Sequence, residues 1–307
     1  MSAPKTDAPA ADVPAWVSRY QPGVPAEIEL PTESLFDLLV RSVAEAGQST
    51  ALTFFGRRTT YAELGAQVLR AAEGLRRLGV RQGDRVGIML PNCPQHVVAF
   101  YAALRLGAIV VEHNPLSTSA ELAGVFADHG ATVAIAWDVA VPKLQAFTDR
   151  GAGEDGADGP QLKHIVAVNL LEEFPLTLQL ALRLPIKKSR ETRAGLTAST
   201  TGTLPWKHLL AAPAIDPGVP RPTVDDVAVI QYTSGTTGQP KGAILTHFNL
   251  YSNALQGAAW MKDAEYRKEV FFAVLPMFHA FGMTLYLTYG VLRQANIVLF
   301  PKFDVDM

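Results

Sequence analysis

The sequence has little cysteine, no strong excess of either charge and no long apolar run. Cys93 is the single cysteine among 307 residues, which excludes an internal disulfide and favours a reducing compartment. The 27 basic and 29 acidic residues nearly balance, so no whole-molecule attraction to nucleic acid is expected. No stretch approaches the roughly 20 apolar residues of a membrane-spanning helix, and residues 1–13 lack the apolar core of a secretion signal. These absences favour a cytoplasmic location.

Strand-like and helix-like segments alternate from residue 53 onward. Residues 53–55 and 57–60 resemble the two arms of a hairpin, and residues 61–78 repeat apolar positions at helical spacing. Further strands are expected at 84–90, 108–112 and 132–137, and a helix at 95–106. Thr118 and Glu121 form a capping-box pattern before another helix. This alternation predicts an α/β fold with mostly parallel sheets flanked by helices.

Composition divides the chain into three parts. Residues 1–32 are expected to be a disordered or extended lead, and residues 33–222 a first α/β subdomain, with loops near 150–163 and 202–222. Residues 223–307 are expected to begin a second subdomain, with strands at 269–275 and 296–300 and helices at 249–261 and 282–292. Because a strand and turn have only just ended at residue 307, the second subdomain is expected to be incomplete.

A leucine-rich and then basic insertion occupies residues 170–194. One interpretation is an interfacial element across 170–193, whose leucines enter a membrane surface while Lys187, Lys188, Arg190 and Arg193 meet anionic lipid. It would make the protein peripheral on the inner face of the membrane. The alternative is an ordinary surface helix that is packed on its neighbour and broken by Pro185.

The most informative stretch is Tyr-Thr-Ser-Gly-Thr-Thr-Gly-Gln-Pro-Lys-Gly at residues 232–242, directly after the apolar run 227–230. Glycines allow positive φ and close backbone approach, while the hydroxyl groups and Lys241 offer donors and charge to a polyanion. The pattern is not a Walker A loop, because Lys241 precedes Gly242 instead of following a glycine and preceding Ser or Thr. The stretch therefore predicts a phosphate-binding loop.

This stretch resembles the AMP-binding signature of the adenylate-forming superfamily, which includes acyl-CoA synthetases, peptide-synthetase adenylation domains and luciferases. Residues 60–64, 104–115 and 275–282 resemble three further motifs of that superfamily, in the same order. The resemblance covers roughly residues 33–307. Within it, the amino-acid sequence is most similar to that of bacterial long-chain fatty-acid–CoA ligases. It implies two stacked β-α-β subdomains of an acyl-CoA synthetase-like N-terminal domain.

The resemblance implies that a fatty acid attacks ATP to form an acyl-adenylate, and that coenzyme A then takes the acyl group. Mg²⁺ and donors neutralise the phosphate charge in such reactions. The phosphate-binding residues implied are Thr233, Ser234, Gly235, Thr236, Thr237, Gly238 and Lys241, with Thr233 also facing the metal. His279, Phe281 and Gly282 would line the acyl pocket. His247, at the end of the signature, is expected to have a capping or packing role.

The resemblance assigns no catalytic residue within residues 1–307, because the family's adenine-contacting motif, ribose-binding aspartate and catalytic lysine lie further along. The 307 residues alone are therefore expected to be inactive. Two alternatives stay open: a non-catalytic truncated product or weak nucleotide- or lipid-binding module, and a ligase for other acyl or aryl acids. A homodimer is a further expectation, because some relatives dimerise through their N-terminal parts.

Overall fold

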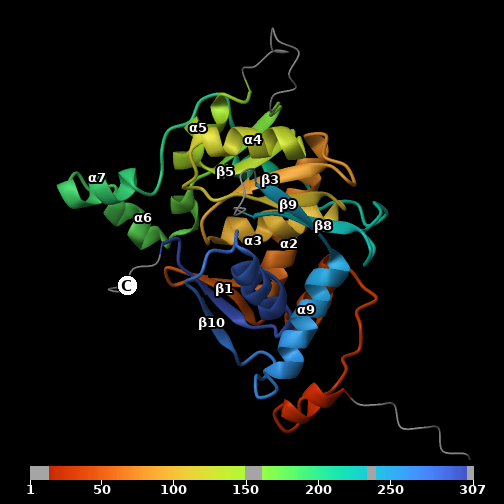
Figure 1. Ribbon diagram of the computed structural model, residues 1–307. Helices are drawn as coiled ribbons and strands as arrows, with labels where there is room; N and C mark the ends of the chain where they lie inside the picture. Colours follow the sequence, from red (N-terminus) through yellow and green to blue (C-terminus); the bar gives the residue numbers. More distant parts are fainter. Residues whose placement is uncertain (1–13, 149–160, 234–239, 303–307) are drawn as a thin grey trace, which may run out of the picture.

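The computed structural model describes residues 14–148, 161–233 and 240–302, which form two sheets with helices on and between them (Figure 1). The larger sheet has the order β7-β6-β5-β3-β4-β8-β9, and the smaller β10-β11-β1-β2. Neighbouring strands pair in parallel except β1 with β2 and β8 with β9. The predicted α/β class and the predicted hairpin are thereby confirmed. The strands are β1 (Thr50–Phe54), β2 (Arg57–Thr60), β3 (Arg85–Met89), β4 (Ile109–Glu112), β5 (Val133–Trp137), β6 (His164–Val168), β7 (Leu204–Pro205), β8 (Val227–Thr233), β9 (Lys241–Thr246), β10 (Val270–Ala273) and β11 (Asn296–Leu299).

Most of the longer helices begin at a polar cap that the sequence supplies. Ser34, Thr60, Thr118 and Thr246 each accept a hydrogen bond from the backbone three residues on, in reciprocal capping boxes. The box predicted at Thr118 is among them. The helices are α1 (Leu35–Ala46), α2 (Tyr61–Arg77), α3 (Pro94–Arg105), α4 (Ser119–His129), α5 (Pro142–Gln145), α6 (Leu176–Leu182), α7 (Lys187–Ala194), α8 (Trp206–Leu210), α9 (His247–Trp260), α10 (Ala280–Gly282) and α11 (Gly290–Leu292); a π-helical segment, η4 (Met283–Tyr289), lies between the last two.

Helix α3 lies between the two sheets, beside α2 (Figure 1). All 12 of its residues are buried, as expected for a helix that is apolar on nearly every face. Side chains of both sheets and of α1 to α3 belong to a single apolar core. The two sheets are therefore held in a fixed relation by this shared layer of helices.

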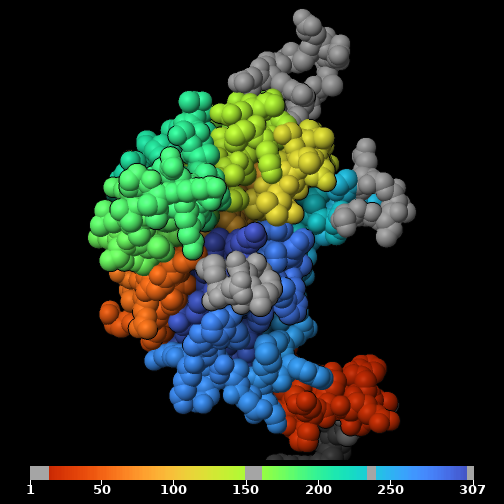
Figure 2. Space-filling model, turned by 90° about the vertical axis from the view of Figure 1, so that its left-hand side faces the viewer, coloured from red at the N-terminus to blue at the C-terminus, as the bar shows by residue number. Residues whose placement is uncertain are grey.

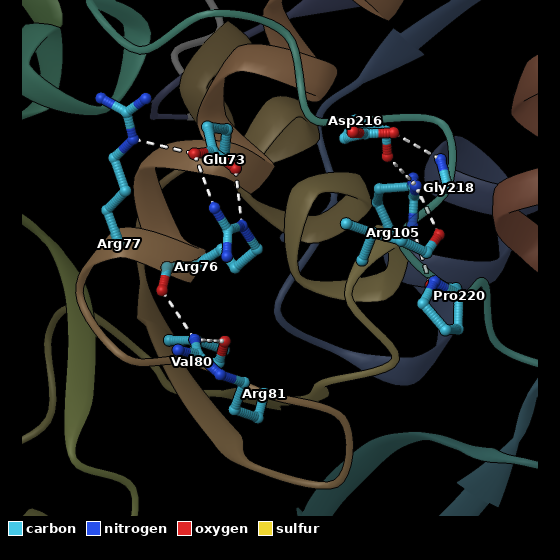
Figure 3. Close-up of polar contacts among 10 residues, drawn as sticks. Glu73, Arg76, Arg77, Val80, Arg81, Arg105, Asp216, Gly218 and Pro220 are labelled. Atoms are coloured by element: carbon cyan, nitrogen blue, oxygen red, sulfur yellow. Dashed lines mark hydrogen bonds and ion pairs between the residues drawn. The ribbon is translucent and has the colours of Figure 1, made fainter.

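Arg105, at the end of α3, fixes the segment that leads into β8. Its guanidinium is buried and donates to the carbonyl oxygens of Val219 and Pro220, each at 2.9 Å, and more weakly to Asp216 at 3.3 Å (Figure 3). The same group lies 5.5 Å from the centre of the Phe36 ring. This buried cation thus directs the chain toward β8, which pairs with β4.

The boundary predicted after residue 222 does not separate the two sheets. Strands β8 and β9 complete the larger sheet, whereas β1 and β2 lie in the smaller sheet with β10 and β11, where β1 pairs with β11. Leu52 faces Ile297 in that pairing, so strands far apart in the chain become neighbours. The reason is that a parallel partner is selected by tertiary packing and not by order along the chain.

Several segments of regular structure were not predicted from the sequence, among them α1, β6, β7, α8 and β9. Residues 202–222, predicted to be a loop, contain β7 and the short helix α8, which buries Trp206 and Leu209. Five residues are too few for a periodic signal. The antiparallel strand β9 was also missed, because its residues lie within the signature and are mostly exposed. Of the predicted lead, the described part contains a 3-10 turn at Ala15–Arg19.

Helices α6 and α7 project from the body of the protein on the side of β1 and β2 (Figure 1). A turned view faces this side of the protein and shows its green residues next to the orange residues of the hairpin region (Figure 2). Ser189 Oγ donates to the Ala181 carbonyl at 3.0 Å and joins the two helices. Within the described ranges, no helix combines the length and the apolar character needed to cross a membrane.

Candidate functional site

A cavity of about 580 Å³ lies at the carboxyl ends of β4 and β8. One wall consists of residues 112–114 at the end of β4, a second of residues 231–233 at the end of β8, and a third of residues 278–280. In open α/β sheets, ligands bind outside the carboxyl ends of the parallel strands. The position and size of this cavity make it the candidate ligand site.

Both ends of the predicted phosphate-binding loop reach this cavity. Thr233 and Pro240 line it, and Thr233 pairs with Lys241 in the β8–β9 register. The Thr233 hydroxyl lies 3.5 Å from the Lys241 carbonyl oxygen. Ser234, Gly235, Thr236, Thr237 and Gly238 lie outside the described residues. Phosphate binding by the loop stays a prediction, but its two ends open on a hollow of suitable size.

The predicted acyl-pocket residues divide between two neighbouring hollows. His279 is exposed and lines the first cavity. Phe281, which is 66% exposed, instead lines a second, mainly apolar hollow of about 470 Å³ against α9. Ala280 contributes to both hollows. Gly282 is buried and lines neither, and a Cβ there would lie 2.1 Å from the Pro276 carbonyl oxygen. Gly282 therefore permits a tight turn that carries His279.

Asn92, after β3, holds the segment that leads to His279. Its amide nitrogen donates to the carbonyl oxygens of Ala273 and Leu275 at 2.7 and 2.8 Å, and its amide oxygen accepts from the Met277 backbone at 2.8 Å. Gln231 donates to the Phe278 carbonyl at 3.2 Å. Sequence analysis missed Asn92. Its only sequence signal is its position between two prolines in residues 91–94.

Buried histidines support the floor of the cavity. His96 Nε2 lies 3.0 Å from a Glu112 carboxylate oxygen, and both side chains are fully buried. His113 stacks on Phe126 with ring centres 4.5 Å apart, and burial holds its pKa well below the ordinary value. A neutral imidazole suits this apolar contact. None of these histidines was a sequence-based candidate. Their partners, Glu112 in β4 and Phe126 in α4, belong to other elements, and the sequence does not show that these elements meet.

Tyr232 links the start of the loop to α4. Its hydroxyl donates to the Asp128 carboxylate, and burial together with this carboxylate raises the pKa of Tyr232. The tyrosine therefore stays protonated and can keep donating. His247, by contrast, does not line the cavity: it is fully buried, and its Nδ1 accepts from the Leu35 backbone at 3.2 Å. That contact is the packing role expected for it.

Comparison with known families identifies the family to which the chain belongs. The family model described as AMP-binding enzyme matches residues 39–307 of this chain. The chain belongs to the AMP-binding enzyme family. The resemblance inferred from the four motifs is thereby confirmed.

Similar family members include ligases for two kinds of acid. A long-chain-fatty-acid–CoA ligase of Bacillus subtilis (strain 168) is 33% identical over 94% of this chain and 50% of its own length. 4-Coumarate–CoA ligase 2 of Oryza sativa subsp. japonica is 32% identical over 81% of this chain and 40% of its own length. The chain thus spans about half the length of the curated relatives that it matches, or less.

A solved structure confirms the fold of this family member. The crystal structure of a long-chain-fatty-acid–CoA ligase from Archaeoglobus fulgidus superposes with a TM-score of 0.71 at 24% identity, and covers 93% of this chain and 50% of that one. At this identity the similarity concerns the fold. It agrees with the arrangement of two helix-flanked sheets described above.

The magnesium role of Thr233 stays a prediction. In residues 14–148, 161–233 and 240–302, no three or more His, Cys, Asp or Glu side chains gather into a group that could hold a metal ion. Thr233 supplies one neutral oxygen, whereas protein sites for Mg²⁺ usually include a carboxylate. No chemical step is assigned to the metal.

Proposed function

We propose that this chain is part of an ATP-dependent fatty-acid–CoA ligase. In the first step, a carboxylate oxygen of the fatty acid attacks the α-phosphorus of ATP. The bond to the bridging oxygen breaks, which releases pyrophosphate and leaves an acyl-adenylate. In the second step, the sulfur of coenzyme A attacks the acyl carbonyl. AMP leaves, the thiol loses its proton and a thioester remains.

The observation that carries this proposal is that one cavity is lined by both Thr233 and His279. Thr233 begins the phosphate-binding loop, and Lys241 ends it in paired register. A hydroxyl and a cation at these positions suit the phosphates of ATP, because positioned donors stabilise the charge that develops at phosphorus. His279 faces the same space and can donate a hydrogen bond that orients the attacking carboxylate.

The second hollow gives a place for the hydrocarbon part of the acid. Ala280 lines both this hollow and the first cavity, and the walls of the hollow include Phe281, Leu285 and Met261. A carboxylate held near His279 could extend its chain past Ala280 into these apolar side chains, which would gain about 25 cal/mol for each Å² of apolar surface removed from water. The names of the bacterial relatives favour a fatty acid as this substrate.

The test measures pyrophosphate release with ATP, Mg²⁺ and palmitate. It is run on the 307-residue chain and on the product of the reading frame that contains it. We expect fatty-acid-dependent release from the latter and none from the 307 residues alone. Absence of release from both would refute the ligase proposal and favour a non-catalytic nucleotide- or lipid-binding module. Release from the 307 residues would show that they carry the complete catalytic machinery.

An aryl acid is the second candidate substrate, because 4-coumarate–CoA ligases are among the similar proteins. A panel of palmitate, octanoate and 4-coumarate in the same assay distinguishes the two. Faster turnover of 4-coumarate would replace the fatty acid in the proposal and leave the ligase reaction intact.

A further inference from the structure

Helix α6 is apolar on two opposite sides. Leu178 and Leu182, four residues apart, face the core. Leu176 and Leu180, also four residues apart, point away from it and are 76% and 62% exposed. An ordinary surface helix carries polar residues on its outer side. The outer leucines are therefore unexplained by the packing of the described residues.

The apolar surface continues into the turn after α6 and then becomes strongly basic. Leu184 and Ile186 are 51% and 53% exposed. Residues 176–196 contain five basic side chains and one acidic side chain, Glu191, a net charge of +4 in a chain whose total is −2. Lys188 and Arg190 take part in none of the ion pairs of the described residues, and the Lys187–Glu191 pair is long, at 3.8 Å, and exposed.

We propose that residues 176–196, the α6–α7 hairpin, dock the protein on an anionic lipid bilayer. The exposed leucines and Ile186 would enter the headgroup region, while the cations of α7 meet lipid phosphates. Helices that combine a leucine-rich side with Lys and Arg bind membranes in this way, and the cytoplasmic membrane surface is negative. This proposal does not depend on the ligase reaction.

Charge and shape favour lipid over other occupants of this surface. A second copy of the same face would bring a charge of +4 against +4, which repels. A nucleic acid would satisfy the cations but would leave the leucines without an apolar partner. The hairpin projects from the body (Figure 1), so its tip can reach a flat surface without obstruction by the two sheets.

Vesicle flotation of the 307-residue chain tests the proposal. We expect the chain to float with vesicles of phosphatidylcholine containing one-third phosphatidylglycerol at low ionic strength, and to float weakly with phosphatidylcholine alone. Higher salt should weaken the binding, because it screens the charges. Equal binding to both vesicles, or binding to neither, would overturn the proposal.

Two sets of variants locate the contact. Leu176→Ser with Leu180→Ser should lower the partition coefficient about ten-fold or more, whereas Leu116→Ser, at a leucine of equal exposure elsewhere (75%), should not change it. Lys187→Gln, Lys188→Gln and Arg190→Gln together should lower it about 100-fold, at roughly five-fold for each cation. Lys163→Gln with Lys207→Gln removes two cations at exposed lysines outside the hairpin and serves as the control; it should lower the partition coefficient far less.

All the substituted side chains are exposed, so thermal melting should confirm that each variant folds. Hairpin variants that bind as the unaltered chain does would overturn the proposal. So would control variants that lose as much binding as the hairpin variants. A dimer that dissociates in Leu176→Ser with Leu180→Ser, measured by light scattering, would instead identify a second copy as the occupant.

Discussion

A single methyl group added at Gly282 tests how the protein holds His279 at the cavity. In Gly282→Ala the new Cβ would lie 2.1 Å from the carbonyl oxygen of Pro276 and 2.7 Å from its carbonyl carbon. Both atoms belong to the backbone, so no side-chain rotation relieves the overlap. Contacts between such atoms are normally well above 3 Å, and the turn at residues 276–282 must therefore open by about 1 Å.

The free energy of this change has three parts. Overpacking a close contact costs about 1–3 kcal/mol. Opening the turn also weakens the hydrogen bond from the His279 backbone to Pro276, now 3.2 Å, which is worth about 1 kcal/mol. Alanine regains about 1 kcal/mol because Gly282 has helical dihedral angles, φ −65° and ψ −39°. The net loss of stability is about 2 kcal/mol.

Thermal unfolding followed by circular dichroism measures this loss. At about 2–4 °C for each kcal/mol in domains of similar size, Gly282→Ala should lower the Tm by about 4–8 °C. Gly124→Ala is the matched control: it lies within α4, and its Cβ would meet no atom within 4 Å. That variant should gain about 0.5–1 kcal/mol. A Gly282 variant that melts at or above the Tm of the unaltered chain would refute the reasoning.

Three further predictions concern the supports of the site and of the core. Asn92→Ala should cost about 2–4 kcal/mol in unfolding free energy, because it leaves two carbonyls and one N–H without their buried partner; a loss below 1 kcal/mol in urea unfolding would contradict this. Gly74→Ala should destabilise the chain by about 1–2 kcal/mol despite better helix propensity, since its Cβ would lie 2.6 Å from Leu209 Cα; a raised Tm would argue against the α2–α8 contact. Burial lowers the pKa of His129 and of His247 to about 4, so the unfolded chain takes up protons first. The contribution of these histidines to the free energy of unfolding should be fully present above pH 6.5 and should be lost as the pH falls toward 4, by up to about 1.4 kcal/mol per pH unit for each histidine. An unchanged Tm between pH 7 and 5 would contradict this.

The sequence alone predicted the features that depend on neighbouring residues. The capping box at Thr118 uses two side chains three positions apart, and the hairpin predicted at residues 53–60 uses a short turn. The family was recognisable for a similar reason: a phosphate-binding loop needs its hydroxyls, glycines and lysine within one contiguous stretch. Such signals require no knowledge of how distant segments meet.

Tertiary structure alone decided which distant segments meet. The pairing of β1 with β11, the contacts of Asn92 with residues 273–277 and the burial of α8 each join parts of the chain that carry no mutual signal. It also decided that His279 and Phe281, two residues apart, line different hollows. The physical reason is that local patterns fix which face of an element is apolar, whereas the partner for that face is selected by the packing of the whole core.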